Sequence, residues 1–353
     1  MARHTPFLHR FATFAGVVLV TLVSCELGLR LVHAVRPSFI FSSRDYNRFR
    51  GRPHAPNYRD RLNSRGFNDR ERTIAKPLGT DRILAVGDSF VFGSVPREHT
   101  FVALAERHLA AAWPRPIEVI NLGVPGTGPP EYVEMLRREG LALAPDLVLC
   151  FVFLGNDLLE TIRPPAWRRS YLVDFVRYLT HILPAYQGRM IHGPTTYDDA
   201  KPNFDRHTYL RIQRARAAVF DSHDRRFSGL VANTLAALDR MRELAAGAGV
   251  GFAVVLIPDE LQIEAELRRE VLALPPARDP AEFDWERPNR VLAEGLAARG
   301  VDVLDLTGPF RTAAREQRLY RLNDSHWNLA GNALAAQLLA VWLQEARART
   351  AHR

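Results

Sequence analysis

Four short polar motifs in this chain contain residue types that serve acyl-transfer chemistry. They are Gly87-Asp88-Ser89, Asn121-Leu122-Gly123, Gly155-Asn156-Asp157 and Asp324-Ser325-His326. A serine hydroxyl becomes an effective nucleophile when a positioned base accepts its proton, and a histidine oriented by a carboxylate is such a base. We therefore predict Ser89 as the nucleophile, His326 as the general acid and base, and Asp324 as the residue that orients the imidazole.

The oxyanion of an acyl-transfer reaction needs hydrogen-bond donors that are already in place. Candidate donors are the backbone N–H groups of Ser89 and Gly123 and the side-chain amide of Asn156. Glycine at position 123 would let the backbone approach the reacting oxygen closely, because it has no Cβ. Each motif alone could also be a turn or a helix cap, so the prediction depends on all four coming together.

The pattern of apolar residues predicts how the motifs meet. Strands are expected at 82–86, 117–121, 146–152, 251–257 and 301–305, and helices at 99–112, 130–140, 229–247, 284–299 and 328–348. Continuous apolar strands that alternate with helices are typical of a parallel sheet covered on both faces, an α/β fold. Ligands bind at the carboxyl ends of such strands. Each motif follows a strand, so we expect all four at one edge of the sheet.

The N-terminus has the pattern of a membrane segment. Arg3 and Arg10 precede an apolar stretch that runs from Phe11 to about residue 32, long enough to cross a bilayer core of ~30 Å. Glu26 and Arg30 lie four residues apart and are expected to pair near the outer interface. We predict a cytoplasmic tail at 1–10 and an uncleaved single-pass anchor at 11–35, with the remaining chain on the periplasmic side of the inner membrane.

An alternative for this segment is lipid attachment, since Leu22-Val23-Ser24-Cys25 resembles a bacterial lipobox. Either way, the chain would be tethered to a membrane.

Composition excludes several classes of protein. The net charge of +8 comes almost entirely from arginine, because Lys76 and Lys201 are the only lysines among 47 basic residues. No basic stripe alternates with aromatic residues, so we expect no nucleic-acid partner. The two cysteines form no disulfide framework and the twelve histidines show no metal-ligand spacing, so we expect neither a metal nor another cofactor.

Two segments interrupt or precede the regular pattern. Residues 36–80 are predicted to be a linker and a lead-in that wraps the domain. The domain itself is expected over 81–348, with an insertion at about 158–228 that is rich in Arg, Tyr and Phe and helical around 170–183. Such an insertion could cap the site, bind a polymer or a partner, or be structural only.

The order of the four motifs resembles that of the SGNH (GDSL-type) hydrolases. This resemblance implies a three-layer α/β/α, flavodoxin-like sandwich with a five-stranded parallel sheet, and it supports the roles of Ser89, Gly123, Asn156 and His326, with Asp324 as third triad member. One departure is that Asn323 stands where the family commonly has its aspartate, three residues before the histidine. The Asp324-x-His326 pattern is similar to the branch that contains alginate O-acetyltransferase-like exopolysaccharide proteins.

Together these observations predict a membrane-anchored serine esterase or O-acyltransferase that works through an acyl-serine intermediate. The expected substrate is a small ester or an O-acylated, most plausibly acetylated, cell-envelope glycan, and polysaccharide-assembly proteins are candidate partners. The alternative is a non-catalytic polysaccharide-binding or assembly protein on the same fold.

Overall fold

The computed structural model describes residues 5–35, 50–51, 53–161, 170–182 and 196–351. The chain divides into two compact units, one of residues 1–48 with 163–190 and one of residues 49–162 with 191–353. Residues 36–49 of the predicted linker and lead-in lie outside the described residues, as do 162–169 and 183–195 of the predicted insertion.

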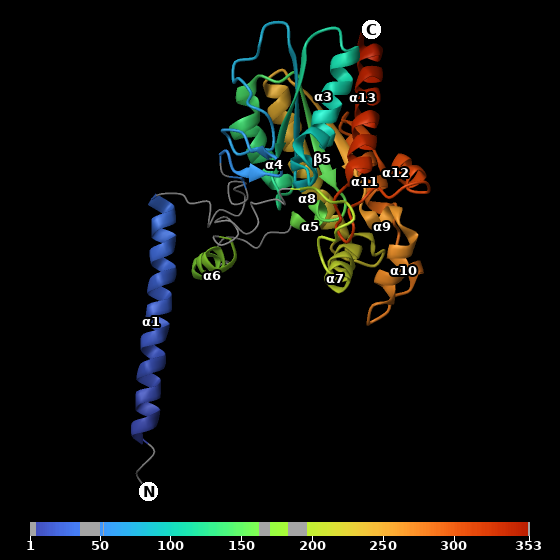
Figure 1. The fold of residues 1–353 in the computed structure, drawn as a ribbon. Helices are drawn as coiled ribbons and strands as arrows, with labels where there is room; N and C mark the ends of the chain where they lie inside the picture. Colours follow the sequence, from blue (N-terminus) through green and yellow to red (C-terminus); the bar gives the residue numbers. More distant parts are fainter. Residues whose placement is uncertain (1–4, 36–49, 52, 162–169, 183–195, 352–353) are drawn as a thin grey trace. The chain divides into compact units, whose positions relative to one another are not determined.

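The larger unit is built on a five-stranded parallel sheet with the strand order β4-β3-β5-β6-β7 (Figure 1). Its strands are β3 (Asp81–Gly87), β4 (Ile117–Gly123), β5 (Leu147–Phe153), β6 (Gly251–Ile257) and β7 (Asp302–Asp305). All five predicted strands are confirmed, with ends that differ by two residues at most. The chain passes from β3 to β4 on one side and then to β5 on the other, so the switch point, where ligands bind in such sheets, lies at β3.

Helices cover both faces of this sheet. On one face, α3 (Phe101–Ala112), α12 (Thr307–Ala313) and α13 (Leu329–Ala351) share a core with alternate strand residues such as Ala85, Phe151 and Val255. On the other face, α4 contacts β3, α8 contacts β6 and α11 contacts β7. These three helices are α4 (Pro129–Met135), α8 (Phe227–Gly247) and α11 (Arg287–Ala297). The predicted three-layer α/β/α sandwich is confirmed.

Several short helices were not expected from the sequence. They are α2 (Ser89–Phe92), α5 (Asp157–Glu160), α7 (Arg206–Arg216), α9 (Glu260–Ile263), α10 (Ala265–Ala273) and the α12 already described. A helix of four residues is too short to show a 3.6-residue period, so the pattern of apolar residues does not reveal it. Before the sheet, β1 (Pro56–Asn57) and β2 (Asp60–Arg61) form a small antiparallel pair within the lead-in.

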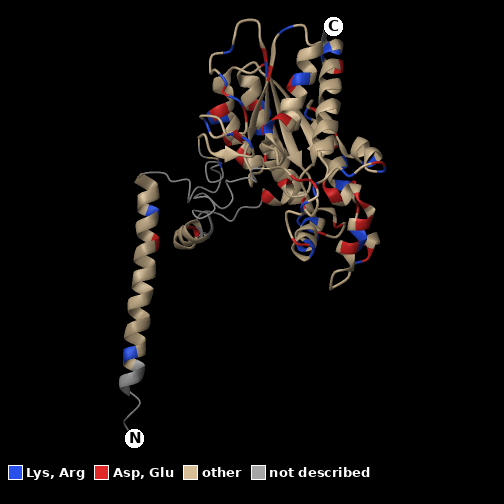
Figure 2. Ribbon diagram, in the orientation of Figure 1, with Lys and Arg blue, Asp and Glu red and all other residues tan. Residues whose placement is uncertain are grey.

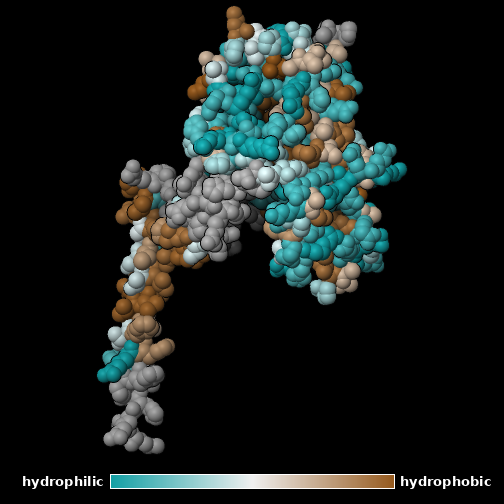
Figure 3. Space-filling view, viewed as in Figure 1, coloured by the Kyte–Doolittle hydropathy of each residue, from teal (hydrophilic) through white to brown (hydrophobic). Residues whose placement is uncertain are grey.

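The smaller unit contains the helix α1 (Thr5–Val35), of which His9–Val35 is long and apolar enough to cross a membrane. Apolar side chains cover most of its length, whereas acidic and basic residues are interspersed over the larger unit (Figures 2 and 3). The expected pair between Glu26 and Arg30 is present at 2.7 Å. The expected helix near 170–183 is present as α6 (Tyr171–Arg177), which continues as a π-helix to Ile182. The length and apolar surface of α1 support membrane anchoring.

Candidate active site

Ser89, His326 and Asp324 form a continuous line of hydrogen bonds, although Ser89 lies 237 residues from His326 in sequence. The Oγ of Ser89 lies 2.7 Å from Nε2 of His326, and Nδ1 of His326 lies 2.6 Å from Oδ1 of Asp324. With the imidazole proton on Nδ1, that nitrogen donates to the carboxylate and Nε2 accepts the serine proton. This is the arrangement that general-base activation of a serine requires.

Ser89 is held at the tip of β3 by the short helix α2. The side chain of Asp88 caps this helix by accepting from the N–H of Phe90 at 2.9 Å. Gly93, with a φ of +89°, ends the helix, and its N–H donates to the carbonyl of Ser89 at 2.9 Å. The Asp88 carboxylate also lies 3.4 Å from the Ser89 hydroxyl, a much longer contact than the one to His326. His326 is therefore the principal partner of the serine.

Asp324, and not Asn323, orients the histidine. Asn323 has a left-handed φ of +48°, and its side chain donates to the carbonyl of Phe204 and accepts from Arg206. Burial opposes ionisation of Asp324, but the charge of His326, two hydrogen bonds from that residue and the nearby Arg321 lower the pKa of Asp324 below its usual value. The carboxylate is thus ionised at neutral pH and can stabilise an imidazolium.

Part of the predicted insertion packs against the turn that carries this pair. The N–H of Asn203 donates to the carbonyl of Leu322 at 3.2 Å, and the N–H of Phe204 donates to the carbonyl of Asn323 at 3.4 Å. These contacts hold the turn from the side of α7. The described residues from 196 onward therefore support the position of Asp324.

Aromatic side chains pack beneath the histidine. The ring of Phe90 lies 5.2 Å from that of His326 and 5.0 Å from that of Trp327, measured between ring centres. Trp327 is almost fully buried and also contacts Phe101 and Phe310. The imidazole thus lies against an apolar layer formed by side chains of α2, α3, α12 and the turn before α13.

The three predicted oxyanion donors differ in their surroundings. The N–H of Ser89 bonds to no other described residue, as the position at the start of α2 allows. The amide nitrogen of Asn156 donates to Glu160 at 3.2 Å, and its buried Oδ1 has no partner among the described residues. The N–H of Gly123 donates to Oδ1 of Asn121 at 2.9 Å. A role of Gly123 as oxyanion donor therefore requires Asn121 to release this N–H.

Gly123 also has a packing reason to be glycine. A Cβ at this position would lie 2.1 Å from the backbone nitrogen of Phe92, in the helix that carries Ser89. In the same loop, Gly126 has a φ of +71° and is exposed, and its N–H bonds to no residue that the structure describes. The sequence pointed to Gly123 as a candidate donor and not to Gly126.

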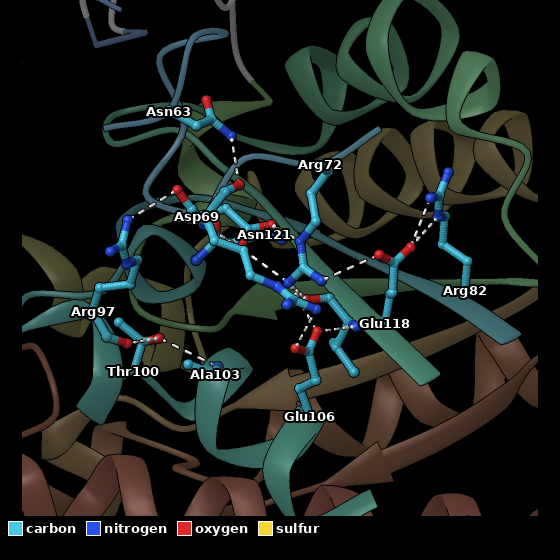
Figure 4. A network of polar contacts seen from close by, with 12 residues as sticks. Asn63, Asp69, Arg72, Arg82, Arg97, Thr100, Ala103, Glu106, Glu118 and Asn121 are labelled. Atoms are coloured by element: carbon cyan, nitrogen blue, oxygen red, sulfur yellow. Dashed lines mark hydrogen bonds and ion pairs between the residues drawn. The ribbon is translucent and has the colours of Figure 1, made fainter. Parts of the chain in front are cut away.

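A polar network connects the lead-in to this part of the site (Figure 4). Asn121 is buried, and its amide donates to the carbonyl of Val91 at 2.6 Å, while its backbone N–H donates to Asp69 at 3.1 Å. Asp69 is in turn paired with Arg72 at 3.0 Å, and Arg72 donates to Glu106 at 2.8 Å. The lead-in is thus an integral part of the compact unit, and through Asn121 it positions the end of α2.

A second buried carboxyl lies close to Asp88. Asp157 accepts from the hydroxyl of Tyr132 at 2.9 Å and from the N–H of Phe153 at 2.9 Å. Burial, followed by the charges of Asp88 and Glu160, raises the pKa of Asp157 well above its usual value. Burial likewise raises the pKa of Asp88. Within the described part of the chain, no three His, Cys, Asp or Glu side chains come together as metal ligands would.

An α/β sandwich with a hydrogen-bonded Ser–His–Asp trio at the carboxyl ends of its strands is a scaffold suited to acyl-transfer chemistry. Residues 216–352 match the family model of the SGNH hydrolase-like domain, acetyltransferase AlgX. This segment includes Asp324 and His326, whereas Ser89 lies outside it. Over these residues the chain is similar to the SGNH-type hydrolases, the family that its motifs also resemble.

Solved structures of esterases and lipases are similar to the chain over most of their length. The acetyl xylan esterase AlAXEase is 13% identical, with 73% of this chain and 97% of that chain covered and a TM-score of 0.41. A lipase/acylhydrolase from Enterococcus faecalis is 18% identical, with 75% and 96% covered and a TM-score of 0.42. At these scores the likenesses carry no argument about function. No curated protein matches the chain in sequence.

Proposed function

We propose that the protein is a membrane-anchored serine acyl hydrolase or O-acyltransferase that forms an acyl-serine intermediate on Ser89. The observation that carries the proposal is the line of hydrogen bonds from Ser89 through His326 to Asp324, with distances of 2.7 and 2.6 Å. The family match supports acyl-ester hydrolysis or transfer as the general chemistry.

In the first half of the reaction, Ser89 Oγ attacks the carbonyl carbon of the ester while Nε2 of His326 takes its proton. The ionised Asp324 stabilises the resulting imidazolium. The tetrahedral intermediate then expels the alcohol, which receives the proton from Nε2, and the acyl group remains on Ser89. In the second half, His326 deprotonates water or an acceptor hydroxyl, whose oxygen attacks the acyl-serine and releases an acid or a new ester.

The oxyanion would be bound by donors on three neighbouring loops. The N–H of Ser89 and the amide of Asn156, once it turns from Glu160, are two of them. Either Gly123, after release by Asn121, or Gly126 would supply the third, and Gly126 requires no bond to be broken first. One such donor typically contributes a factor of about 10²–10³ to the rate.

For the substrate, we propose an O-acetyl group on a cell-envelope glycan, with the larger unit on the periplasmic face of the inner membrane. The description of the matching family as an acetyltransferase supports the acetyl group, and α1 supports a location at a membrane. Polysaccharide-assembly proteins remain candidate partners. A glycan acceptor would receive the acyl group in transfer, and water would receive it in hydrolysis.

The test uses the full chain in detergent with p-nitrophenyl acetate as substrate. We expect Ser89→Ala and His326→Ala each to lower kcat/KM by at least a thousandfold and to abolish labelling of Ser89 by a fluorophosphonate. Ser228→Ala and His108→Ala are matched controls, because both side chains are exposed and lie outside the site. Wild-type turnover in both Ser89→Ala and His326→Ala would refute the mechanism.

A second measurement separates the remaining alternatives. Mass spectrometry of an acetylated donor glycan and a deacetylated acceptor, with and without the enzyme, distinguishes loss of acetyl groups from their transfer. If neither occurs, and Ser89 is not labelled by the fluorophosphonate, the non-catalytic polysaccharide-binding alternative is favoured instead.

A further inference from the structure

The carboxylate of Glu26, within the apolar helix α1, binds the beginning of α6. It accepts hydrogen bonds from the hydroxyl of Ser170 and from the N–H groups of Tyr171 and Leu172, each at 2.9 Å. The first N–H groups of a helix have no partner within the helix, so a carboxylate there satisfies them and complements the helix dipole. Glu26 thus acts as a cap supplied by a helix distant in sequence.

Tyr171 completes this contact between α1 and α6. The guanidinium of Arg30 lies 4.5 Å from the centre of the Tyr171 ring, and the ring of His33 meets it edge-on at 5.5 Å. All of these residues belong to the same compact unit. Charged side chains in a membrane-spanning helix cost free energy unless other polar groups bind them. The start of α6 supplies such contacts to both Glu26 and Arg30.

The helical segment 171–182 has a second, apolar face. Val173, Val176 and Leu179 follow one another at intervals of three residues and are 64%, 49% and 42% exposed. Side chains at this spacing lie along one side of a helix. Tyr171 and Phe175, on the other side, are buried or half-buried. The segment therefore has one face towards α1 and an apolar face that the described protein leaves uncovered.

We propose that the segment 171–182 is a second membrane-contacting element, which lies in the boundary between headgroups and acyl chains of the bilayer that α1 crosses. From Phe11, the first residue after Arg10, to Glu26 the helix rises by about 23 Å at ~1.5 Å per residue, within a bilayer core of ~30 Å. Glu26, and with it the start of α6, then lies in the outer part of that core, near its boundary with the headgroups. A short helix with an apolar face is stable at this depth.

The occupant of the apolar face is lipid because the segment that carries it packs against a helix whose apolar window is 0% buried. Glu26 and Arg30 keep the segment beside α1, and Val173, Val176 and Leu179 contact acyl chains. The charged pair of α1 therefore serves to attach a segment of the insertion to the membrane anchor. This proposal does not depend on the catalytic role of Ser89.

The experiment uses the full chain in vesicles of phosphatidylcholine and phosphatidylglycerol. Cys25 is replaced by alanine, and an environment-sensitive fluorophore is attached to Val176→Cys. Val341→Cys on α13 is the matched control, since Val341 is 47% exposed and belongs to the larger unit. We expect lipids with a nitroxide near the headgroup to quench the fluorophore at position 176 at least threefold more than at position 341, and aqueous iodide to show the reverse order.

Equal quenching at the two positions would overturn the proposal. So would protection of position 176 that depends on protein concentration and not on lipid, which would indicate a second copy of the chain on this face. The capping role is tested with Glu26→Ala, which should make position 176 at least twofold more accessible to iodide. Glu26→Gln, which keeps an acceptor oxygen, should have a smaller effect, and Thr21→Ala on the same helix should have none. No change in Glu26→Ala would refute the attachment through Glu26.

Discussion

Replacement of Asp324 by asparagine tests the orientation of the histidine most directly. One carboxylate oxygen accepts from both the N–H of His326, at 3.1 Å, and Nδ1 of the same residue, at 2.6 Å. The other oxygen lies 3.3 Å from Nη1 of Arg321. Asparagine has one acceptor oxygen and one donor group, so it cannot satisfy both sides.

Each orientation of the asparagine has a specific cost. If its oxygen stays on His326, its NH₂ group faces the donor of Arg321. If the NH₂ group faces His326 instead, it opposes the backbone N–H and favours the tautomer with a proton on Nε2, which cannot accept the proton of Ser89. Both orientations also lose the negative charge that stabilises the imidazolium.

We expect Asp324→Asn to lower kcat/KM for p-nitrophenyl acetate by about 10³–10⁴, or roughly 4–5.5 kcal/mol of transition-state stabilisation. Circular dichroism should show an intact fold. In the double variant Arg321→Gln/Asp324→Asn, the glutamine oxygen can accept from the NH₂ group, so activity should rise about tenfold over the single variant. Asn323→Ala should stay within threefold of the wild type. The reasoning fails if Asp324→Asn keeps more than a tenth of the activity, or if Asn323→Ala loses as much.

Three further predictions concern packing and pH. In Gly123→Ala, the new Cβ would lie 2.1 Å from the backbone nitrogen of Phe92, so α2 must move. We expect kcat/KM to fall at least tenfold and the melting temperature to fall as well. An unchanged melting temperature would contradict this prediction. Trp327→Ala should cost about 3–5 kcal/mol in urea unfolding, whereas Trp327→Phe should cost much less, because the indole Nε1 has no partner among the described residues; equal losses would contradict the packing argument. The pKa of Asp157 is raised in the folded state, so its contribution to stability is present below the unfolded value of 3.8 and is lost as pH rises through the folded value. The free energy of unfolding of Asp157→Asn should therefore rise relative to that of the wild type as the pH increases from 4 to 8. A difference between the two proteins that does not change with pH would contradict a raised pKa of Asp157.

The sheet and the position of the site could be predicted from the sequence because both follow from long patterns. Continuous apolar runs specify buried strands, and a parallel sheet brings the carboxyl ends of those strands to one edge. The pattern therefore predicted that Ser89, Asn156 and His326 lie at the same edge. The short helices such as α9 were not predicted, since four residues cannot show a helical period.

The sequence does not show which donor and acceptor groups of the lead-in bind each other in the folded chain. Asp69 and Arg72 lie in a stretch without a regular apolar pattern. Nothing in the sequence therefore indicates that they pair beside the edge strand β4, or that Asp69 accepts from the backbone N–H of Asn121. Asp324 was predicted from the sequence, and the folded backbone adds the reason that Asn323 does not take its place: Asn323 is left-handed, and its side chain donates to the carbonyl of Phe204. The contacts of Asp69 and Arg72 require the folded backbone, because they depend on which acceptor each donor reaches.

Gly123, the last residue of β4, and Gly126, in the loop that follows, differ in how their N–H groups are bound. Gly123 lets the end of the strand pass within contact of α2, and its N–H is bound by Asn121, which also holds the carbonyl of Val91. These bonds fix α2, and therefore Ser89, relative to the sheet. Gly126 is glycine for a different reason, because its φ is in the left-handed region. Its N–H bonds to no residue that the structure describes. Gly123 thus helps to position Ser89, while Gly126 leaves an N–H without a partner among the described residues in the loop that follows β4. In the proposed mechanism, such an N–H is a candidate oxyanion donor.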